Sequence, residues 1–305
     1  AERLVLLGSI AVIVLNFALQ FYKVIPSSIE HHALALVPAV ILLAIGQWLR
    51  RHEATRCLAL VFHVLALSFF VAPQGANLIF LSLPAHMAPV DATLVWLDSL
   101  FGVSWPALCA WLAQFPLLNE IVRTIYVATV PAMLVCLLFL AWQGDEKQLG
   151  LGQLSVAIGL LLTIVCWIIF PSAGASSYWQ LDPAVDAAIR PVVDSEHGAM
   201  IVRLMRDGVP ELGVMDMGGM VGFPSYHTAL GIFILLCLWT RPLLRMIALA
   251  LAPILAFGIL THGGHTLMDL LGGCVVAAIS WRLSQQILQS SAKQAFAHAE
   301  PAHAG

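Results

Sequence analysis

Charged side chains are scarce in this sequence. Lysine, arginine, aspartate and glutamate together make up 10% of its 305 residues, whereas hydrophobic residues make up 60%. A soluble domain usually carries about 25% charged residues. A water-soluble globule of this size cannot hide so much apolar surface, so the composition predicts that a lipid bilayer is the main solvent and partner.

Basic patches and paired cysteines are also missing. The 14 basic and 17 acidic residues give a formal net charge of -3, which argues against a nucleic-acid partner. The six cysteines form no C-x-x-C pair, and isolated cysteines in apolar runs behave as small hydrophobic residues. We therefore expect no disulfide framework, no structural zinc and no cofactor.

Long apolar runs are what the sequence has instead. A membrane-spanning helix needs about 20 apolar residues, at roughly 1.5 Å of rise per residue. Runs that meet or approach this length lie at 4–22, 33–49, 56–74, 121–142, 152–171, 226–240, 243–261 and 266–287. They predict an all-α fold, a polytopic membrane helix bundle of about eight transmembrane helices.

Residues 75–120 alternate apolar and polar stretches and contain several prolines. This pattern predicts one or two interfacial helices, with Trp96, Trp105 and Trp111 at headgroup depth. The chain then divides into N-terminal transmembrane helices with an interfacial segment (1–118), a second helix bundle (119–290) and a C-terminal tail (291–305).

The distribution of basic residues predicts the orientation of the bundle, because cytoplasmic loops are enriched in lysine and arginine. With eight spans, most basic residues fall on the side that holds both termini, so that side is predicted to be cytoplasmic. The sixth and eighth runs then begin at the external face. We expect both ends of the chain on the cytoplasmic side.

His265 and Asp269 form the most unusual polar pair, because Asp269 lies inside an apolar run. Residues four apart share one face of a helix, so the carboxylate can accept a hydrogen bond from the imidazole. Such a pair leaves the other ring nitrogen free as a nucleophile. A carboxylate at membrane depth is usually functional or paired, and the alternative here is an ion pair that only packs the bundle.

His227 opens the sixth run, directly after Pro224 and Ser225. The first amides of a helix are unpaired donors that can hold an anion. A serine hydroxyl and a histidine at this place add a donor and a source of protons. The alternative is an ordinary histidine at the membrane interface.

Two motifs carry a family resemblance. "FPSYHTA" from Phe223 and "HTLMD" from His265 resemble the second and third motifs of the type 2 phosphatidic acid phosphatase superfamily. These membrane enzymes break lipid phosphoesters through a phosphohistidine. Tyr226 stands where a glycine is usual, and Gly258 and Ile259 replace Ser-Arg. These departures resemble the inositol phosphorylceramide synthase-like branch, and "FPSAGASSYW" and "LMRDG" resemble its bacterial members. The resemblance implies a bacterial inner membrane with the site on the periplasmic side.

The resemblance, which covers roughly residues 120–287, implies a role for each matching position. His265 would be the nucleophile, Asp269 its orienting partner and His227 the acid that protonates the leaving group. Ser225 and Tyr226, with the neighbouring amides, would bind phosphate oxygens. The family's first motif is incomplete here. The expected phosphate-binding cations are therefore Arg203 and Arg206, and Arg190 is the fallback.

The predicted protein is thus a metal-independent lipid phosphate phosphatase or phosphotransferase. Its substrate would be a lipid phosphate or phospholipid, and its acceptor water or the hydroxyl of a lipid or sugar. Two alternatives remain open at this point. One is a metal-dependent hydrolase in which His262 joins His227, His265 and Asp269 as a ligand. The other is a proton-coupled transporter that uses the same groups as a relay.

Overall fold

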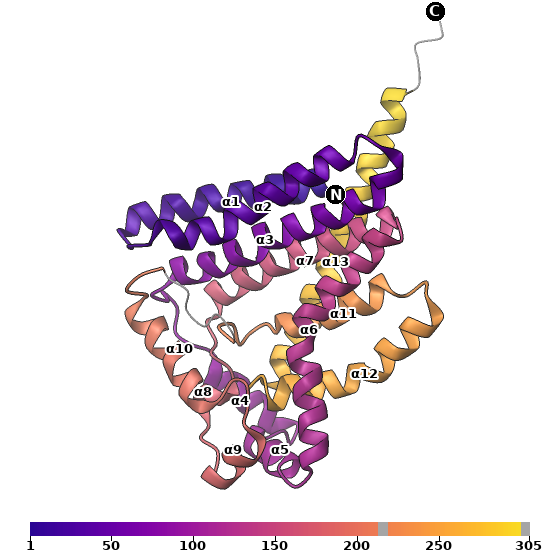
Figure 1. The fold of residues 1–305 in the computed structure, drawn as a ribbon. Coiled ribbons are helices and arrows are strands. Elements are labelled where there is room, and N and C mark those ends of the chain that lie inside the picture. The colour runs from indigo at the N-terminus through magenta and orange to yellow at the C-terminus, as the bar shows by residue number, and fades with distance from the viewer. Residues whose placement is uncertain (213–218, 300–305) are drawn as a thin grey trace, which may run out of the picture.

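The protein is a bundle of helices in the computed structural model, which describes residues 1–212 and 219–299 (Figure 1). Seven of the described helices are long and apolar enough to cross a membrane. They are α1 (Glu2–Lys23), α2 (Ile29–Leu49), α3 (Arg56–Ser82), α6 (Pro116–Trp142), α7 (Glu146–Ile169), α12 (Pro242–Thr261) and α13 (Leu267–Ala299). The sixth predicted run forms a shorter apolar helix, α11 (Tyr226–Cys237). The predicted all-α polytopic membrane fold is confirmed.

Five short helices gather at the end of the bundle where α7 ends and α13 begins (Figure 1). They are α4 (Asp91–Leu100), α5 (Trp105–Leu112), α8 (Ala175–Tyr178), α9 (Pro183–Ile189) and α10 (Ser195–Asp207). A single 3₁₀ turn, η1 (Glu53–Thr55), joins α2 to α3 near the opposite end. Of the predicted tail 291–305, residues 300–305 lie outside the described part of the chain.

The segment predicted to be interfacial is built differently from the expectation. Its first residues, 75–82, continue α3, and its two helices α4 and α5 meet at a bend of 69°. Trp96 and Trp111 are exposed, as expected for headgroup depth, but Trp105 is buried. The indole Nε1 of Trp105 donates a hydrogen bond to the carbonyl of Thr261, 3.2 Å away, so this tryptophan anchors α5 to the end of α12.

Ion pairs connect the loops at the other end of the bundle. They join Arg50 to Glu2, Arg56 to Glu146 and Arg241 to Asp145. These residues lie at the ends of different long helices, so the connections α2–α3, α6–α7 and α11–α12 share one end with the start of α1. The predicted cytoplasmic loops therefore do lie together, opposite the five short helices.

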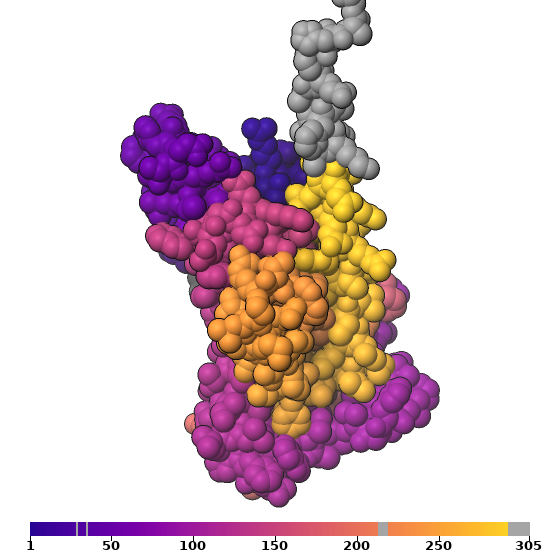
Figure 2. All heavy atoms as spheres, turned by 90° about the vertical axis from the view of Figure 1, so that its right-hand side faces the viewer, coloured from indigo at the N-terminus to yellow at the C-terminus, as the bar shows by residue number. Residues whose placement is uncertain are grey.

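α11 belongs to the second half of the chain and packs on α6, α7, α12 and α13. Its Phe233 is fully buried in an apolar cluster that combines side chains of α3, α6, α7, α11 and α13. α12 lies at the periphery of the bundle, and a smaller share of its residues is buried than in α6, α7 or α13. Figure 2 views the molecule from the side where α11 and α12 (orange) adjoin α13 (yellow). A packed α11 can hold the residues at its start in fixed positions.

Candidate active site

The start of α13 is fixed by a reciprocal cap between Thr266 and Asp269. The Asp269 carboxylate oxygen Oδ2 accepts a hydrogen bond from the Thr266 amide at 2.7 Å, and Thr266 Oγ1 accepts one from the Asp269 amide at 3.2 Å. A hydroxyl residue followed three positions later by an acidic one is a sequence signature of a helix start. The cap therefore sets the position of the only carboxylate within the eighth predicted span.

His265 contacts the same carboxylate. Its ring nitrogen Nδ1 lies 3.1 Å from Asp269 Oδ2, and both side chains are buried, with 6% and 0% of their surface exposed. An ionised carboxylate can only accept hydrogen bonds, so in the neutral imidazole Nδ1 carries the proton. The lone pair then resides on Nε2, which is the nitrogen available for nucleophilic attack.

His227 and His265 both lie beside Tyr126 of α6. The rings of His227 and Tyr126 stack with their centroids 4.7 Å apart and an angle of 28° between the ring planes. The rings of Tyr126 and His265 both border Gly263. A Cβ atom added to this glycine would lie 3.0 Å from Tyr126 Cε2 and 2.9 Å from His265 Cδ2. The structure thus brings together the two histidines that the sequence analysis paired.

The segment "FPSAGASSYW" packs against the loop that carries His265. The Ser176 amide donates a hydrogen bond to the carbonyl of Gly264 at 3.3 Å. Gly174 has a φ of +86°, and a Cβ there would lie 2.5 Å from that carbonyl oxygen. Only glycine allows this approach without a shift of the backbone. The Gly222 amide also donates to the carbonyl of Ser172, which ties the segment to the chain just before His227.

Two buried aspartates of α4 hold these loops from the outside. The Asp91 carboxylate accepts hydrogen bonds from Ser172 Oγ at 2.7 Å and from the Gly174 amide at 2.8 Å. The Asp98 carboxylate accepts hydrogen bonds from the Leu267 amide at 2.9 Å and from the Met268 amide at 3.4 Å, and so caps α13 from another helix. α4 therefore braces both loops that shape the site.

Several buried polar atoms around this site have no hydrogen-bond partner among the described residues. They are Arg123 Nε of α6, Ser176 Oγ of α8, His197 Nε2 of α10, and both ring nitrogens of His262. Ser176 Oγ lies 2.7 Å from the place of a Cβ on Gly264, and His262 is joined through its carbonyl to the Val193 amide. Buried polar groups are normally paired, so these atoms are free to bind water or a polar ligand.

His262 is completely buried at the end of α12. Burial, reinforced by the positive charge of Arg123, lowers the pKa of His262 to about 4. The ring is therefore neutral at neutral pH, with one nitrogen that can donate and one that can accept a hydrogen bond. Arg123 supplies the positive charge in this part of the site.

The residues predicted to bind phosphate have varied surroundings. Ser225 is buried and caps α11, since its hydroxyl oxygen accepts a hydrogen bond from the Thr228 amide at 3.4 Å. The Tyr226 hydroxyl donates to the carbonyl of Val156 in α7 at 2.8 Å. Tyr226 thus points into the helix packing, and the structure gives its hydroxyl a partner other than phosphate.

The three predicted phosphate-binding arginines are exposed. Arg190 pairs with Glu120 at 2.7 Å, and Arg206 pairs with its neighbour Asp207 at 2.8 Å. Arg203 lies on α10, where it is exposed as well. Within residues 1–212 and 219–299, no hydrogen bond or ion pair joins any of them to the two histidines. A role in phosphate binding stays a prediction for each.

The structure also shows residues that sequence reasoning missed. Arg123, Asp91 and Asp98 were not among the predicted site residues, yet each has buried polar atoms in or beside the site. The available signal was a charged residue within or next to an apolar segment, which applies to Arg123 near the start of the fourth run. The aspartates follow no such pattern, because their partners are far away in sequence.

The geometry gives no support to the metal-ligand alternative. Within residues 1–212 and 219–299, no group of three or more histidine, cysteine, aspartate or glutamate side chains is arranged to hold a metal ion. His265 and Asp269 bind each other, and His227 stacks on Tyr126.

Comparisons with known proteins agree with the geometry. The family model described as PAP2 superfamily matches residues 92–283, from α4 to the middle of α13. Searches of curated proteins and of solved structures returned no match. The matched region holds both histidines, Asp269, the two loops and the bracing helix α4. Because this match covers more than half of the chain, the protein belongs to the PAP2 superfamily.

Proposed function

We propose that this protein is a lipid phosphatase or phosphotransferase of the inositol phosphorylceramide synthase-like branch, working through a phosphohistidine on His265. The observation that carries the proposal is the placement of His265, oriented by Asp269, and His227 beside one tyrosine ring. Nucleophilic catalysis needs a nucleophile whose tautomer is fixed by a third group, and a separate acid nearby.

In the first step, His265 Nε2 attacks the phosphorus atom and a phosphorus–nitrogen bond forms. The bond from phosphorus to the lipid oxygen breaks, and His227 donates its proton to that departing oxygen. The Asp269 carboxylate accepts a hydrogen bond from Nδ1–H throughout, without taking up the proton. Its negative charge stabilises the positive charge that develops on the ring. Histidine side chains supply both the nucleophile and the acid.

In the second step, His227 removes a proton from the acceptor hydroxyl, whose oxygen attacks phosphorus and releases His265. With water as acceptor the product is inorganic phosphate. With the hydroxyl of a lipid or sugar, the product is a new phosphoester. The acid of the first step thus becomes the base of the second, as reversible proton transfer requires.

The phosphate oxygens need donors, and the buried unpaired atoms around the 262–265 loop can supply them. We assign the main positive charge to Arg123, because its Nε is buried with no partner in the described part of the chain and its charge acts on His262. Ser176 Oγ and a ring nitrogen of His262 would donate further hydrogen bonds. Fixed donors aimed at a developing charge are usually the largest single contribution to catalysis.

The proposed location is a bacterial inner membrane with the site on the periplasmic side. The support is the grouping of basic loops at one end and of the site at the other. Lysine and arginine concentrate on the cytoplasmic side, which would place both ends of the chain there. A cysteine introduced near Arg190 should then react with a membrane-impermeant maleimide in intact cells.

The direct test is to incubate purified protein with phosphatidic acid labelled with ³²P and to look for labelled protein. A phosphohistidine resists alkali and is lost in acid. Wild-type protein should show this label and release phosphate or a new phosphoester, and His265→Ala should show neither. Turnover that survives in His265→Ala would overturn the mechanism. Activity lost with EDTA and restored by zinc would favour the metal hydrolase instead.

A further inference from the structure

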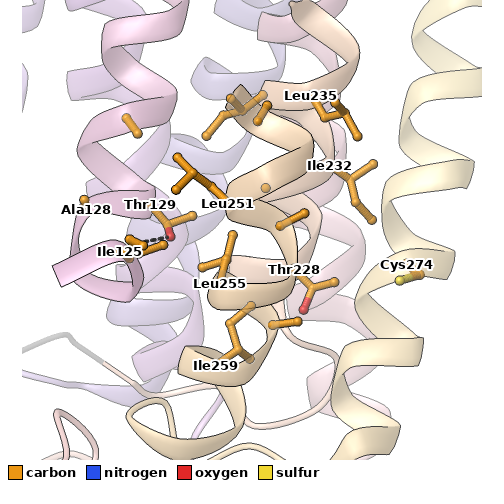
Figure 3. Close-up of a pocket in the computed structure, with 16 residues that line it drawn as sticks. Ile125, Ala128, Thr129, Thr228, Ile232, Leu235, Leu251, Leu255, Ile259 and Cys274 are labelled. Atoms are coloured by element: carbon orange, nitrogen blue, oxygen red, sulfur yellow. Dashed lines mark hydrogen bonds between the residues drawn. The ribbon is translucent and has the colours of Figure 1, made fainter. Parts of the chain in front are cut away.

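An apolar groove runs along α11 in the membrane-spanning part of the protein. Its volume is about 290 Å³, and α6, α11, α12 and α13 contribute side chains to its walls (Figure 3). The groove exists because small residues face it where larger ones would close the gap. These are Ala128, Ala132, Gly231, Ala248, Ala252 and Ala256.

One end of the groove adjoins the proposed active site. Thr228 lines the groove and directly follows His227 in the chain. Thr129 also lines it and lies one helical turn from Tyr126, the residue that stacks on His227. In Figure 3, Thr228 and Ile259 lie toward one end and Leu235 toward the other. Leu235 follows Thr228 by seven positions in the helix, a rise of about 10 Å.

The walls offer almost no polar groups to a ligand. Thr129 Oγ1 is satisfied within α6 by a hydrogen bond to the Ile125 carbonyl at 3.0 Å. Thr228 differs, because its Oγ1 is buried and has no partner among the described residues. A ligand that fits these walls is therefore a hydrocarbon chain, with an oxygen atom at the end beside His227.

We propose that this groove holds one hydrocarbon chain of the lipid whose phosphate reacts at His265. The inference rests on the proposed function and adds to it a site for the lipid chain. Thr228 Oγ1 donates to the oxygen that joins the chain to the headgroup. The chain extends along α11 toward Leu235, and Gly231 lies about halfway between the two ends.

Gly231 is the position at which the groove is most easily blocked. A Cβ added there would lie 2.7 Å from the Leu255 side chain, which lines the opposite wall on α12. That atom is the end of the flexible Leu255 side chain, so Leu255 can turn aside when a larger side chain is placed at position 231. The larger side chain then fills part of the groove. Gly231→Leu should shorten the space for a chain while leaving the start of α11 in place.

Binding can be tested apart from catalysis. The probe is dodecyl phosphate with a photoreactive diazirine near the far end of its chain, applied to His265→Ala protein, and adducts are mapped by mass spectrometry. We expect adducts on groove residues of α11 and α12, at least fivefold more than with the matching dodecanol probe. Equal labelling by the two probes, or adducts on other helices, would overturn the proposal.

Gly231→Leu should lower that labelling at least fivefold. The matched control is Ala250→Leu, which adds the same side chain to an exposed position of α12 that does not line the groove. This control should label like the parent protein. If both substitutions reduce labelling equally, the loss reflects general damage to the helix pair, and the groove assignment is wrong.

The dependence of kcat/KM on the length of the substrate's hydrocarbon chain tests the groove separately from the proposed function. In the protein with His265 intact, Gly231→Leu should reduce kcat/KM for dodecyl phosphate about tenfold, as expected if two methylene groups lose their burial. The change for butyl phosphate should be under twofold. An equal loss for both chains contradicts the groove. Failure of the unsubstituted protein to cleave any lipid phosphate contradicts the proposed function, while the labelling result would still decide the groove.

Discussion

The backbone amide of Ser225 donates a hydrogen bond to the carbonyl oxygen of Asp269, with nitrogen and oxygen 2.9 Å apart. This bond joins the cap of α11 directly to the first turn of α13. His227 follows Ser225 by two residues, and His265 precedes Asp269 by four, so one backbone contact fixes the spacing between the motifs. A change that separates these two helices would move both imidazoles at once.

The orientation of His265 predicts the effect of Asp269→Asn. An asparagine can turn its NH₂ group toward Nδ1, which would then have to accept, and the proton would move to Nε2. The nucleophilic lone pair would be lost from the attacking nitrogen. We expect kcat to fall by about 10²- to 10⁴-fold with the fold retained. Release of ³²P-phosphate from labelled lipid measures the fall, and activity within tenfold of wild type would contradict this role for Asp269.

The surroundings of the arginines predict which one supports phosphate binding. Arg123→Gln removes the positive charge beside His262 and should lower kcat/KM by about 10²- to 10³-fold, the usual result of losing a donor to developing charge. Arg190→Gln and Arg206→Gln, at exposed residues already paired with carboxylates, are the matched controls and should change it less than threefold. Steady-state kinetics on all three variants decides the assignment, and the reverse ranking would restore the sequence-based expectation.

The fold was predictable because apolar runs of span length report directly on helices in lipid. The bounds were less predictable where polar residues interrupt a run. The third run was expected to end at 74, yet α3 continues to Ser82. The reason is a contact between helices: Asn16 of α1 donates hydrogen bonds to the carbonyl and to the side-chain oxygen of Gln74, at 2.9 Å and 3.0 Å. These polar groups are thereby satisfied inside the bundle.

The candidate site was predictable only where its residues are close in sequence. His265 and Asp269 lie four apart, so helical geometry alone pairs them. Asp98 binds amides at Leu267 and Met268, and that contact joins distant segments that no local pattern connects. The resemblance also implied phosphate binding at Tyr226, whereas only a structure could show that its hydroxyl reaches Val156.

The hydrogen bond between the Tyr226 hydroxyl and the Val156 carbonyl predicts a mild phenotype for Tyr226→Phe. The substitution removes one hydrogen bond to the Val156 carbonyl and keeps the ring in the helix packing. The free energy of unfolding should fall by about 0.5–1.5 kcal/mol. KM for the lipid phosphate should stay within twofold of wild type. Thermal denaturation in detergent and steady-state kinetics test the two parts, and a KM raised tenfold or more would show that this residue does bind the substrate.

Substitution of Asp98 should change kcat rather than KM, because Asp98 holds the start of α13 and has no proposed contact with the substrate. In Asp98→Ala, the amides of Leu267 and Met268 lose their acceptor at a buried helix start. Removing the partner of a buried donor costs about 1–3 kcal/mol, and a helix start without its cap can shift. We expect kcat to fall roughly tenfold or more while KM changes little, since His265 and Asp269 lie on either side of the shifted turn.

Asp98→Asn separates positioning from a general loss of stability. The amide oxygen of asparagine can still accept a hydrogen bond, so kcat should recover at least in part, although the negative charge is gone. Asp207→Asn is the matched control, because it makes the same change at an exposed residue of α10 and should leave kcat unchanged. If Asp98→Asn is as inactive as Asp98→Ala, the charge itself would be required, and the carboxylate would act on the chemistry rather than through α13.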